Sequence, residues 1–173
     1  RRSIVNASRM LYRSRMRFTV FSKSFCNPDY WERTDDGGFT SGSVVKPSSA
    51  INDIFRHGYM YGTECATAIV IVFYKAALDV LGEELFNRIF PVIRLMNWQD
   101  IDSDLGIRYY RYAKDILPGD CVYFKNPDVD PLTPELQGEN AIDLGNGTFY
   151  GHGFGIMPAE GFIMELNRHR ITG

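Results

Sequence analysis

Cysteine and histidine are scarce in this sequence, which contains three of each among 173 residues. An odd number of cysteines at irregular spacing does not support a disulfide framework and indicates a reducing compartment. The longest hydrophobic run, 66–74, ends at Lys75 and is far shorter than the roughly 20 residues of a membrane-spanning helix. We also recognise no secretory signal, so neither a disulfide-rich secreted protein nor a membrane-spanning protein is indicated.

Neither sign of charge is in large excess, but the charges are unevenly placed. Nineteen Lys and Arg against 21 Asp and Glu leave a net charge of −2, which argues against a dedicated nucleic-acid binder. Residues 1–28 contain six Arg, one Lys and no acidic residue, so this segment carries +7 and the other 145 residues carry −9. We interpret 1–28 as a basic amphipathic helix packed on the rest of the chain. A membrane surface, a nucleic acid and a transit peptide are the alternatives.

Length and composition predict one domain with one core. Hydrophobic residues make up 45% of the chain and charged residues 23%, close to the average of globular proteins. We expect residues 1–173 to form this single domain. The chain begins with Arg1 and ends at Gly173 just after a polar stretch, and we interpret it as a fragment that lacks its native N- and C-terminal ends.

A long apolar segment dominates the pattern of expected elements. Residues 63–81 are too many for one strand and lie between the cap residues Thr63 and Gly82, so they predict a buried central helix. Ser48 is the expected N-cap of a shorter helix that Gly58 ends. Further helices are expected at 2–22 and 83–88, and strands at 29–39 (turning at 35–38), 93–98, 109–114, 121–124, 139–144 and 148–156. A buried helix on an antiparallel sheet is an α+β arrangement.

Cys65 stands at the start of the expected central helix. Free backbone N–H groups and the positive end of the helix dipole favour a thiolate there, and a thiolate is a nucleophile. The alternative is that Cys65 is a small buried hydrophobe, as free cysteines usually are. Cys26 and Cys121 lack that position, and we expect both to be structural, with Cys121 in a core strand.

His152 is the histidine that best fits a base for this thiol. It lies between Gly151 and Gly153 in an expected strand, where glycines indicate the close approach of another chain or a ligand. Either two-residue turn at 145–147 places His152 and Glu139 on one face of the hairpin, whereas a three-residue loop places them on opposite faces. His57 is instead explained by a helix C-terminus, and a core histidine satisfied by a hydrogen bond is the alternative for His152.

Four motifs occur in a specific order along the chain. They are Tyr61-Gly62-Thr63-Glu64-Cys65-Ala66-Thr67, Leu117-Pro118-Gly119-Asp120-Cys121-Val122-Tyr123-Phe124, Gly138-Glu139-Asn140 and Gly151-His152-Gly153-Phe154-Gly155. A cysteine at a helix start followed by a strand histidine and a carboxylate is a papain-like arrangement, and the second motif resembles that of the NlpC/P60 papain-like superfamily. Together the motifs resemble the bacterial spore-coat protein-glutamine γ-glutamyltransferases over most of the chain.

The resemblance implies a calcium-independent enzyme that joins a protein glutamine to a lysine amine, through a cysteine thioester, during spore coat assembly. It implies Cys65 as the nucleophile, Glu139 and His152 as catalytic partners, and Glu64 as a supporting carboxylate. Cofactors and metals are not implied. The implied partners are coat proteins that supply Gln and Lys, without nucleic acid or a membrane span. The implied location is the sporulating cell and its spore coat surface.

Two other functions remain open at this point. An NlpC/P60-type cysteine peptidase or amidase of cell-wall peptides shares the order of Cys and His, although Ala66-Thr67 follows the cysteine here instead of Ser-Gly. A catalytically silent coat or scaffold protein is the second. A zinc site of Cys65, Cys121 and His152 lacks the usual ligand spacing.

Overall fold

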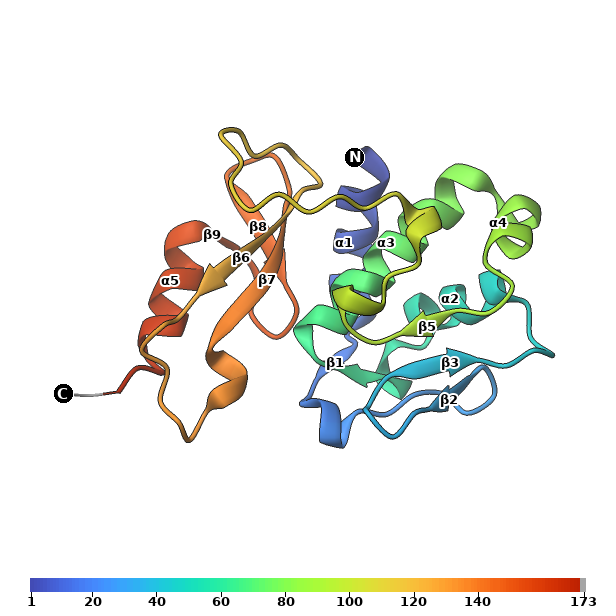
Figure 1. The fold of residues 1–173 in the computed structure, drawn as a ribbon, viewed down its shortest axis with the longest axis horizontal. Helices are drawn as coiled ribbons and strands as arrows, with labels where there is room; N and C mark the ends of the chain where they lie inside the picture. Colours follow the sequence, from blue (N-terminus) through green and yellow to red (C-terminus); the bar gives the residue numbers. More distant parts are fainter. Residues whose placement is uncertain (172–173) are drawn as a thin grey trace.

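Helix α3 (Cys65–Leu81) forms the centre of the protein, which is described here for residues 1–171 by a computed structural model (Figure 1). Every side chain from Cys65 to Ala76 is buried, because the segment is apolar nearly all round. The predicted central helix is therefore confirmed. Its N-cap is Glu64, not Thr63, and Gly82 ends it as expected.

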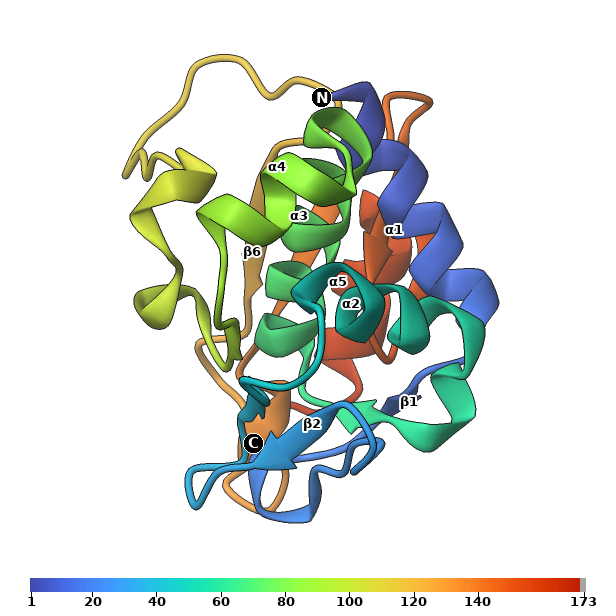
Figure 2. The same ribbon diagram turned by 90° about the vertical axis from the view of Figure 1, so that its right-hand side faces the viewer.

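Four other helices surround α3 in the described part of the chain. They are α1 (Arg2–Ser14), α2 (Pro47–Arg56), α4 (Glu83–Ile89) and α5 (Ala159–Asn167). Figures 1 and 2 show α1 alongside α3, with Ala7 and Leu11 on its buried face. None of the helices in residues 1–171 has the length and hydrophobicity to cross a membrane.

The strands of residues 1–171 form three small sheets. The first pairs β1 (Arg17–Phe18) in parallel with β4 (Gly62–Thr63). The second is antiparallel, in the order β2 (Trp31–Arg33), β3 (Phe39–Ser41) and β5 (Arg94–Leu95). The third is antiparallel, in the order β6 (Cys121–Lys125), β7 (Gly138–Asp143), β8 (Thr148–Gly151) and β9 (Gly155–Pro158).

The four-stranded sheet lies between two helical layers. Helices α3 and α1 contact β7 on one side and α5 contacts β9 (Figure 1). On the α5 side, Phe162 stacks on Phe124 with ring centroids 4.9 Å apart and packs edge-on against Phe149. This mixed arrangement of helices and antiparallel sheets confirms the α+β prediction.

The predicted helix 2–22 is too long at its C-terminal end. Helix α1 ends after Ser14, where Arg15 adopts the left-handed conformation (φ 59°, ψ 28°) and donates its N–H to the carbonyl of Tyr12. The chain then extends into β1, so the basic segment 1–28 is a helix followed by a strand and a short 3₁₀ turn. The sequence 15–22 lacks Gly and Pro, which is why periodicity alone extended the helix.

Two predicted strands and one predicted cap are also wrong. Residues 109–114 form no regular element and expose Tyr110 and Tyr112, so they pack on no sheet. Residues 148–156 form two strands, not one, since Gly153 and Gly155 turn the chain with φ values of +99° and +88°. The N-cap of α2 is Lys46, with Pro47 in its first turn, not Ser48.

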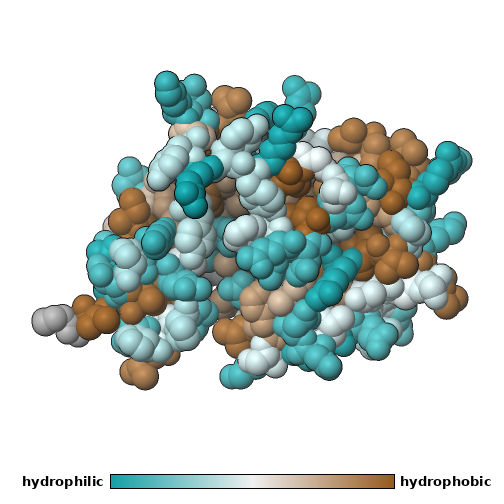
Figure 3. Space-filling model, in the orientation of Figure 1, coloured by the Kyte–Doolittle hydropathy of each residue, from teal (hydrophilic) through white to brown (hydrophobic). Residues whose placement is uncertain are grey.

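Burial of α3 makes a direct prediction for the stability of the fold. Ile71 is fully buried on α3, so Ile71→Ala should lower the free energy of unfolding by about 2–5 kcal/mol. Val80 on the same helix is 71% exposed, near the α4 end where Figure 3 shows hydrophobic side chains at the surface. Val80→Ala is thus the matched control. If urea unfolding showed similar decreases in the free energy of unfolding for the two variants, the central position of α3 would be contradicted.

Candidate active site

The N-terminus of α3 positions a buried cysteine between polar groups. Cys65 is the first residue of the helix and is 4% exposed. The side chain of the N-cap residue Glu64 accepts a hydrogen bond from the N–H of Ala66 at 3.1 Å, which begins the helix. The backbone N–H of Cys65 makes no hydrogen bond within residues 1–171, so a donor remains beside the thiol.

Three side chains surround the Cys65 thiol. Its Sγ lies 3.6 Å from Glu64 Oε2, and Asn140 donates its side-chain N–H to Sγ at 3.5 Å. Glu139, next to Asn140 on β7, lies near enough for its charge to raise the pKa of the thiol. The structure therefore brings together Cys65, Glu64 and Glu139, three of the four residues that the sequence predicted, and adds Asn140.

Glu139 is a buried carboxyl without full hydrogen bonding. It is 2% exposed, and its Oε1 has no hydrogen-bond partner in residues 1–171. Burial raises the pKa of Glu139, and the nearby charge of Glu64 raises it further. Burial also raises the pKa of Glu64, against the lowering effect of the Ala66 N–H. Two carboxyls in one desolvated site therefore favour a state that carries a proton.

The Cys65 thiol is not ionised in the way that its helix position suggested. Burial raises the pKa of Cys65, and the adjacent carboxylates Glu139 and Glu64 raise it further. These effects exceed the lowering effect of the hydrogen bonds from Asn140. Burial and the two neighbouring carboxylates therefore oppose the thiolate that the helix N-terminus would favour.

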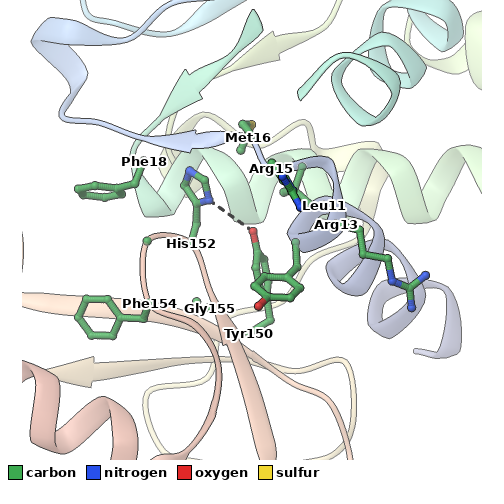
Figure 4. Close-up of a pocket in the computed structure, with 12 residues that line it drawn as sticks. Leu11, Arg13, Arg15, Met16, Phe18, Tyr150, His152, Phe154 and Gly155 are labelled. Atoms are coloured by element: carbon green, nitrogen blue, oxygen red, sulfur yellow. Dashed lines mark hydrogen bonds between the residues drawn. The ribbon is translucent and has the colours of Figure 1, made fainter. Parts of the chain in front are cut away.

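His152 lies apart from the thiol, in the turn between β8 and β9. Its Nε2 is 3.0 Å from the backbone carbonyl of Arg17, and its Nδ1 is 3.5 Å from the hydroxyl of Tyr150 (Figure 4). Within residues 1–171 no hydrogen bond joins His152 to Cys65 or Glu139. Burial lowers the pKa of His152 to about 4, so the ring is neutral. The hydrogen bond of the ring to the Arg17 carbonyl connects the turn 152–154 to β1.

The β7–β8 hairpin explains this separation. Its register pairs Ala141 with Gly151, and Leu144 N–H bonds the carbonyl of Thr148, so the loop has three residues, 145–147. The two-residue turns expected from the sequence are therefore wrong. With three residues, Glu139 and His152 belong to opposite faces of the hairpin, because side chains alternate along a strand.

The glycines around His152 allow the N-terminal segment of the same chain to come close. A Cβ on Gly153 would lie 3.0 Å from the ring of Phe18, and one on Gly155 would lie 3.5 Å from the ring of Tyr12. The expectation of a close approach is confirmed. The approaching group is α1 and the strand that follows it, which the sequence did not indicate.

Sequence reasoning did not select Asn140 and Tyr150 as site residues. Asn140 follows Glu139 directly and is half-buried, with its amide at the thiol of Cys65. A second polar side chain next to Glu139 in an expected strand was the signal that could have identified it. Tyr150 is 1% exposed and interacts with His152. Its spacing of two residues from His152, which places both side chains on one face of an expected strand, was the signal that could have identified it.

The other two cysteines are separate from this site. Cys121 was expected in a core strand but is exposed, because β6 is the edge strand of its sheet. Cys26 is half-buried, and its Sγ lies 3.7 Å from the carbonyl of Trp31. In residues 1–171 no group of three or more His, Cys, Asp or Glu side chains is arranged to hold a metal ion.

Two cavities flank His152, and Cys65 lines neither of them. The larger has a volume of about 670 Å³ and lies between α1 and the turn 151–155. The smaller, about 240 Å³, lies between that turn, Leu136 and His169. The thiol is therefore enclosed by its neighbours.

The fold and this site define a mixed α/β protein built around a buried cysteine beside Glu64, with the charge of Glu139 acting on the same thiol. The model of the family "Protein-glutamine gamma-glutamyltransferase" matches residues 1–173, and the chain belongs to this family. It is 51% identical over 169 residues to the protein-glutamine gamma-glutamyltransferase of Bacillus mycoides (strain KBAB4) and 50% identical to that of Bacillus cereus (strain 03BB102). Both matches cover 98% of this chain but 60% of the relative, so the chain spans about three fifths of their length.

A solved structure has the same fold. The transglutaminase from Geobacillus stearothermophilus (without C-terminal extension) superposes with a TM-score of 0.95 and is 52% identical, covering 99% of this chain and 82% of that one. The family resemblance found in the sequence is thereby confirmed.

The buried, neutral His152 predicts a specific loss of stability in acid. An exposed imidazole has a pKa of about 6.5, and the folded value is about 4. Between these values the unfolded chain binds more protons, so the free energy of unfolding falls as the pH is lowered. Titration of this histidine should lower the free energy of unfolding at pH 5 by about 2 kcal/mol relative to pH 7.

Urea unfolding of wild type and His152→Gln at pH 7 and pH 5 measures this effect. The variant lacks the titrating ring and should lose less stability on acidification, while other groups titrate equally in both proteins. An equal loss would show that His152 is not held neutral.

Proposed function

We propose that this protein is a protein-glutamine γ-glutamyltransferase that joins glutamine and lysine side chains through a thioester on Cys65. Membership of the family supports the activity. The observation that carries the assignment to residues is the buried Cys65 thiol beside Glu64 and Asn140, with the charge of Glu139 close enough to raise its pKa. A thiol, an adjacent carboxyl and a free backbone donor are the groups that acyl transfer requires.

In the first half-reaction, the Cys65 thiol proton passes to an adjacent carboxylate, Glu139 or Glu64. Sγ forms a bond to the carboxamide carbon of the glutamine, and the carbonyl oxygen becomes an oxyanion. The N–H of Cys65 and the side-chain amide of Asn140 are the nearest donors for this oxyanion. The C–N bond then breaks, the carboxylic acid protonates the departing nitrogen, and ammonia and a thioester result.

In the second half-reaction, a neutral lysine amine attacks the thioester carbon. The nitrogen loses a proton to the same carboxylate, and the C–S bond breaks. The carboxylic acid returns the proton to Sγ. The products are an isopeptide bond and the original thiol, so one carboxyl serves as base and acid in turn.

Glu139 is the preferred direct base. His152 is a positioning residue, which holds the strand pair that leads into Cys65. The charge of Glu139 acts on the thiol, whereas His152 is bonded to the Arg17 carbonyl and has a pKa of about 4. Arg17 pairs with Gly62 in the strand that leads into Cys65. His152 therefore supports the placement of the nucleophile. Glu64 supplies a second carboxylate on the other side of Sγ.

Burial of the thiol favours transfer over hydrolysis. Cys65 is 4% exposed and lines neither cavity beside the site. Entry of a glutamine side chain thus requires neighbouring side chains to move, and a filled site leaves little room for water to attack the thioester.

The wider proposal follows the family resemblance of the sequence. Residues 1–173 act as a single catalytic domain that needs neither calcium nor another cofactor. The cross-linked partners are spore coat proteins, the protein acts inside the sporulating cell at the coat surface, and its chain folds on an NlpC/P60-like, papain-like plan. The buried cysteine at a helix start, packed beside an antiparallel sheet, supports this plan.

Removal of the nucleophile tests the activity. Cys65→Ala should abolish incorporation of a labelled primary amine into a glutamine-bearing protein such as casein, while Cys121→Ala, which removes an exposed cysteine, should retain it. Muropeptide hydrolysis measured in parallel separates transfer from peptidase activity. Amine incorporation by Cys65→Ala would overturn the mechanism, and hydrolysis without incorporation by wild type would favour the peptidase.

Removal of the carboxyls tests the base. Glu139→Gln should lower kcat by about a hundredfold, since it removes a general base but keeps the shape of the side chain. Glu64→Gln combined with it should lower kcat further. Glu83→Gln, on the exposed start of α4, is the control. His152→Gln should leave the dependence of kcat on pH unchanged. If His152→Gln instead abolished the pH-dependent rise or fall of kcat while Glu139→Gln stayed active, His152 would be the base.

The raised pKa of Cys65 predicts slow alkylation. Iodoacetamide should label Cys65 more slowly at pH 7 than an unperturbed cysteine peptide, and the rate should rise with pH, because burial and the two carboxylates oppose the thiolate. Mass spectrometry of tryptic peptides distinguishes Cys65 from Cys26 and Cys121. Rapid labelling at neutral pH would instead indicate a preformed thiolate.

A further inference from the structure

The larger cavity is an open pocket beside the active centre, with a distinct chemical character. It has a volume of about 670 Å³, and its wall combines the end of α1, β1 and the turn 151–155. Figure 4 shows Phe18 and Phe154 at one end and Arg13 and Arg15 at the other, with His152 and Tyr150 between them. The proposed chemistry uses none of the cationic groups of this pocket.

The arginines of this segment are not neutralised by the protein. Of the seven basic residues in 1–28, only Arg1 forms an ion pair within residues 1–171, with Asp120. Arg13, Arg15 and Arg17 are exposed, and residues 1–28 contain no acidic side chain. A cluster of unpaired arginines beside a cavity attracts anionic groups and holds carboxylates well.

Arg15 also occupies a backbone conformation that favours glycine. It is the one residue other than glycine with positive φ in residues 1–171 (φ 59°), at the end of α1. Glycine or asparagine is usual at this position, and another residue costs conformational energy there. No hydrogen bond or ion pair of the Arg15 side chain within residues 1–171 offsets this cost. A strained arginine at a pocket rim is a feature of binding sites.

We propose that this pocket docks an acidic segment of a protein substrate, with Arg13 and Arg15 binding its carboxylates. The aromatic rings of Tyr12, Phe18 and Phe154 pack on the apolar parts of the segment. This proposal rests on the proposed function, since it assigns the surface to a substrate of that reaction.

The shape and charge of the protein favour an acidic peptide over other anionic partners. The wall is concave and partly aromatic, which suits a peptide chain better than a flat membrane surface. The rest of the chain carries −9, so a long nucleic acid would meet repulsion outside the pocket. A short acidic segment contacts only the basic region.

The pocket is connected to the nucleophile through short contacts. His152 lines the pocket and bonds the carbonyl of Arg17, which pairs with Gly62, three residues before Cys65. A segment docked here therefore lies beside the strand pair β1–β4 that leads into Cys65. Recognition next to the site raises the local concentration of the attached glutamine or lysine.

Binding is measured on the inactive Cys65→Ala protein, so that the result does not depend on catalysis. The probes are two dye-labelled peptides with one glutamine, which differ only in a flanking run of four glutamates or four serines. Fluorescence anisotropy at low salt should show tighter binding of the glutamate peptide, and the difference should shrink as salt is added. Equal affinity for the two peptides would overturn the proposal.

Variants then locate the binding to the pocket. Arg13→Ser combined with Arg15→Gly should weaken binding of the glutamate peptide by about fivefold and leave the serine peptide unchanged. Arg88→Ser, which removes an exposed arginine on α4, is the matched control and should bind as before. Arg15→Gly should not lower the thermal midpoint, because glycine relieves the left-handed strain, so weaker binding cannot be attributed to unfolding.

Two further outcomes would contradict the assignment. If Arg88→Ser weakened binding of the glutamate peptide as much as the pocket variant does, the effect would depend on the net charge of the protein and not on the pocket. Tighter binding of a single-stranded oligonucleotide than of the glutamate peptide would assign the basic segment to nucleic acid. Activity assays on the same peptides with the active protein then test whether docking lowers KM. Intact binding without any activity would refute the proposed function alone.

Discussion

Burial of α3 from Cys65 to Ala76 is the constraint on which the other features of this protein depend. The helix is apolar nearly all round, so it must be covered by α1 and α2 as well as by the four-stranded sheet. Its first residue, Cys65, is therefore enclosed together with Glu64 and Glu139. In this desolvated place a negative charge is costly, and the pKa of the thiol and of both carboxyls is raised. The same burial that stabilises the fold favours the protonated form of the Cys65 thiol.

The basic N-terminal segment belongs to the architecture of the site. It covers α3 with α1 and then pairs with β4, which leads into Cys65. His152 bonds the carbonyl of Arg17 and so ties the glycine-rich turn 151–155 to that strand. The arginines that this arrangement leaves at the surface surround a cavity next to the centre. One segment thus pairs with the strand that precedes Cys65 and presents positive charge at the surface.

Local sequence signals predicted those elements whose geometry depends on nearby residues. The central helix ends at Gly82, and the turn 35–38 joins β2 and β3. The strand expected at 109–114 failed because β propensity reflects packing on a half-buried sheet, and this segment is exposed. The N-terminal helix was overextended because the left-handed Arg15 is an arginine, which carries no stop signal.

The sequence by itself determined that a cysteine begins a long buried helix, and the order of the motifs around Cys65, Gly119, Glu139 and His152 determined the family. Only the tertiary structure decided which of the candidate partners reaches the thiol. A loop of three residues instead of two moved Glu139 and His152 to opposite faces of a hairpin. It also decided the charge of the site, since burial and neighbouring carboxylates, which depend on the packing of distant segments, outweigh the local effect of a helix N-terminus.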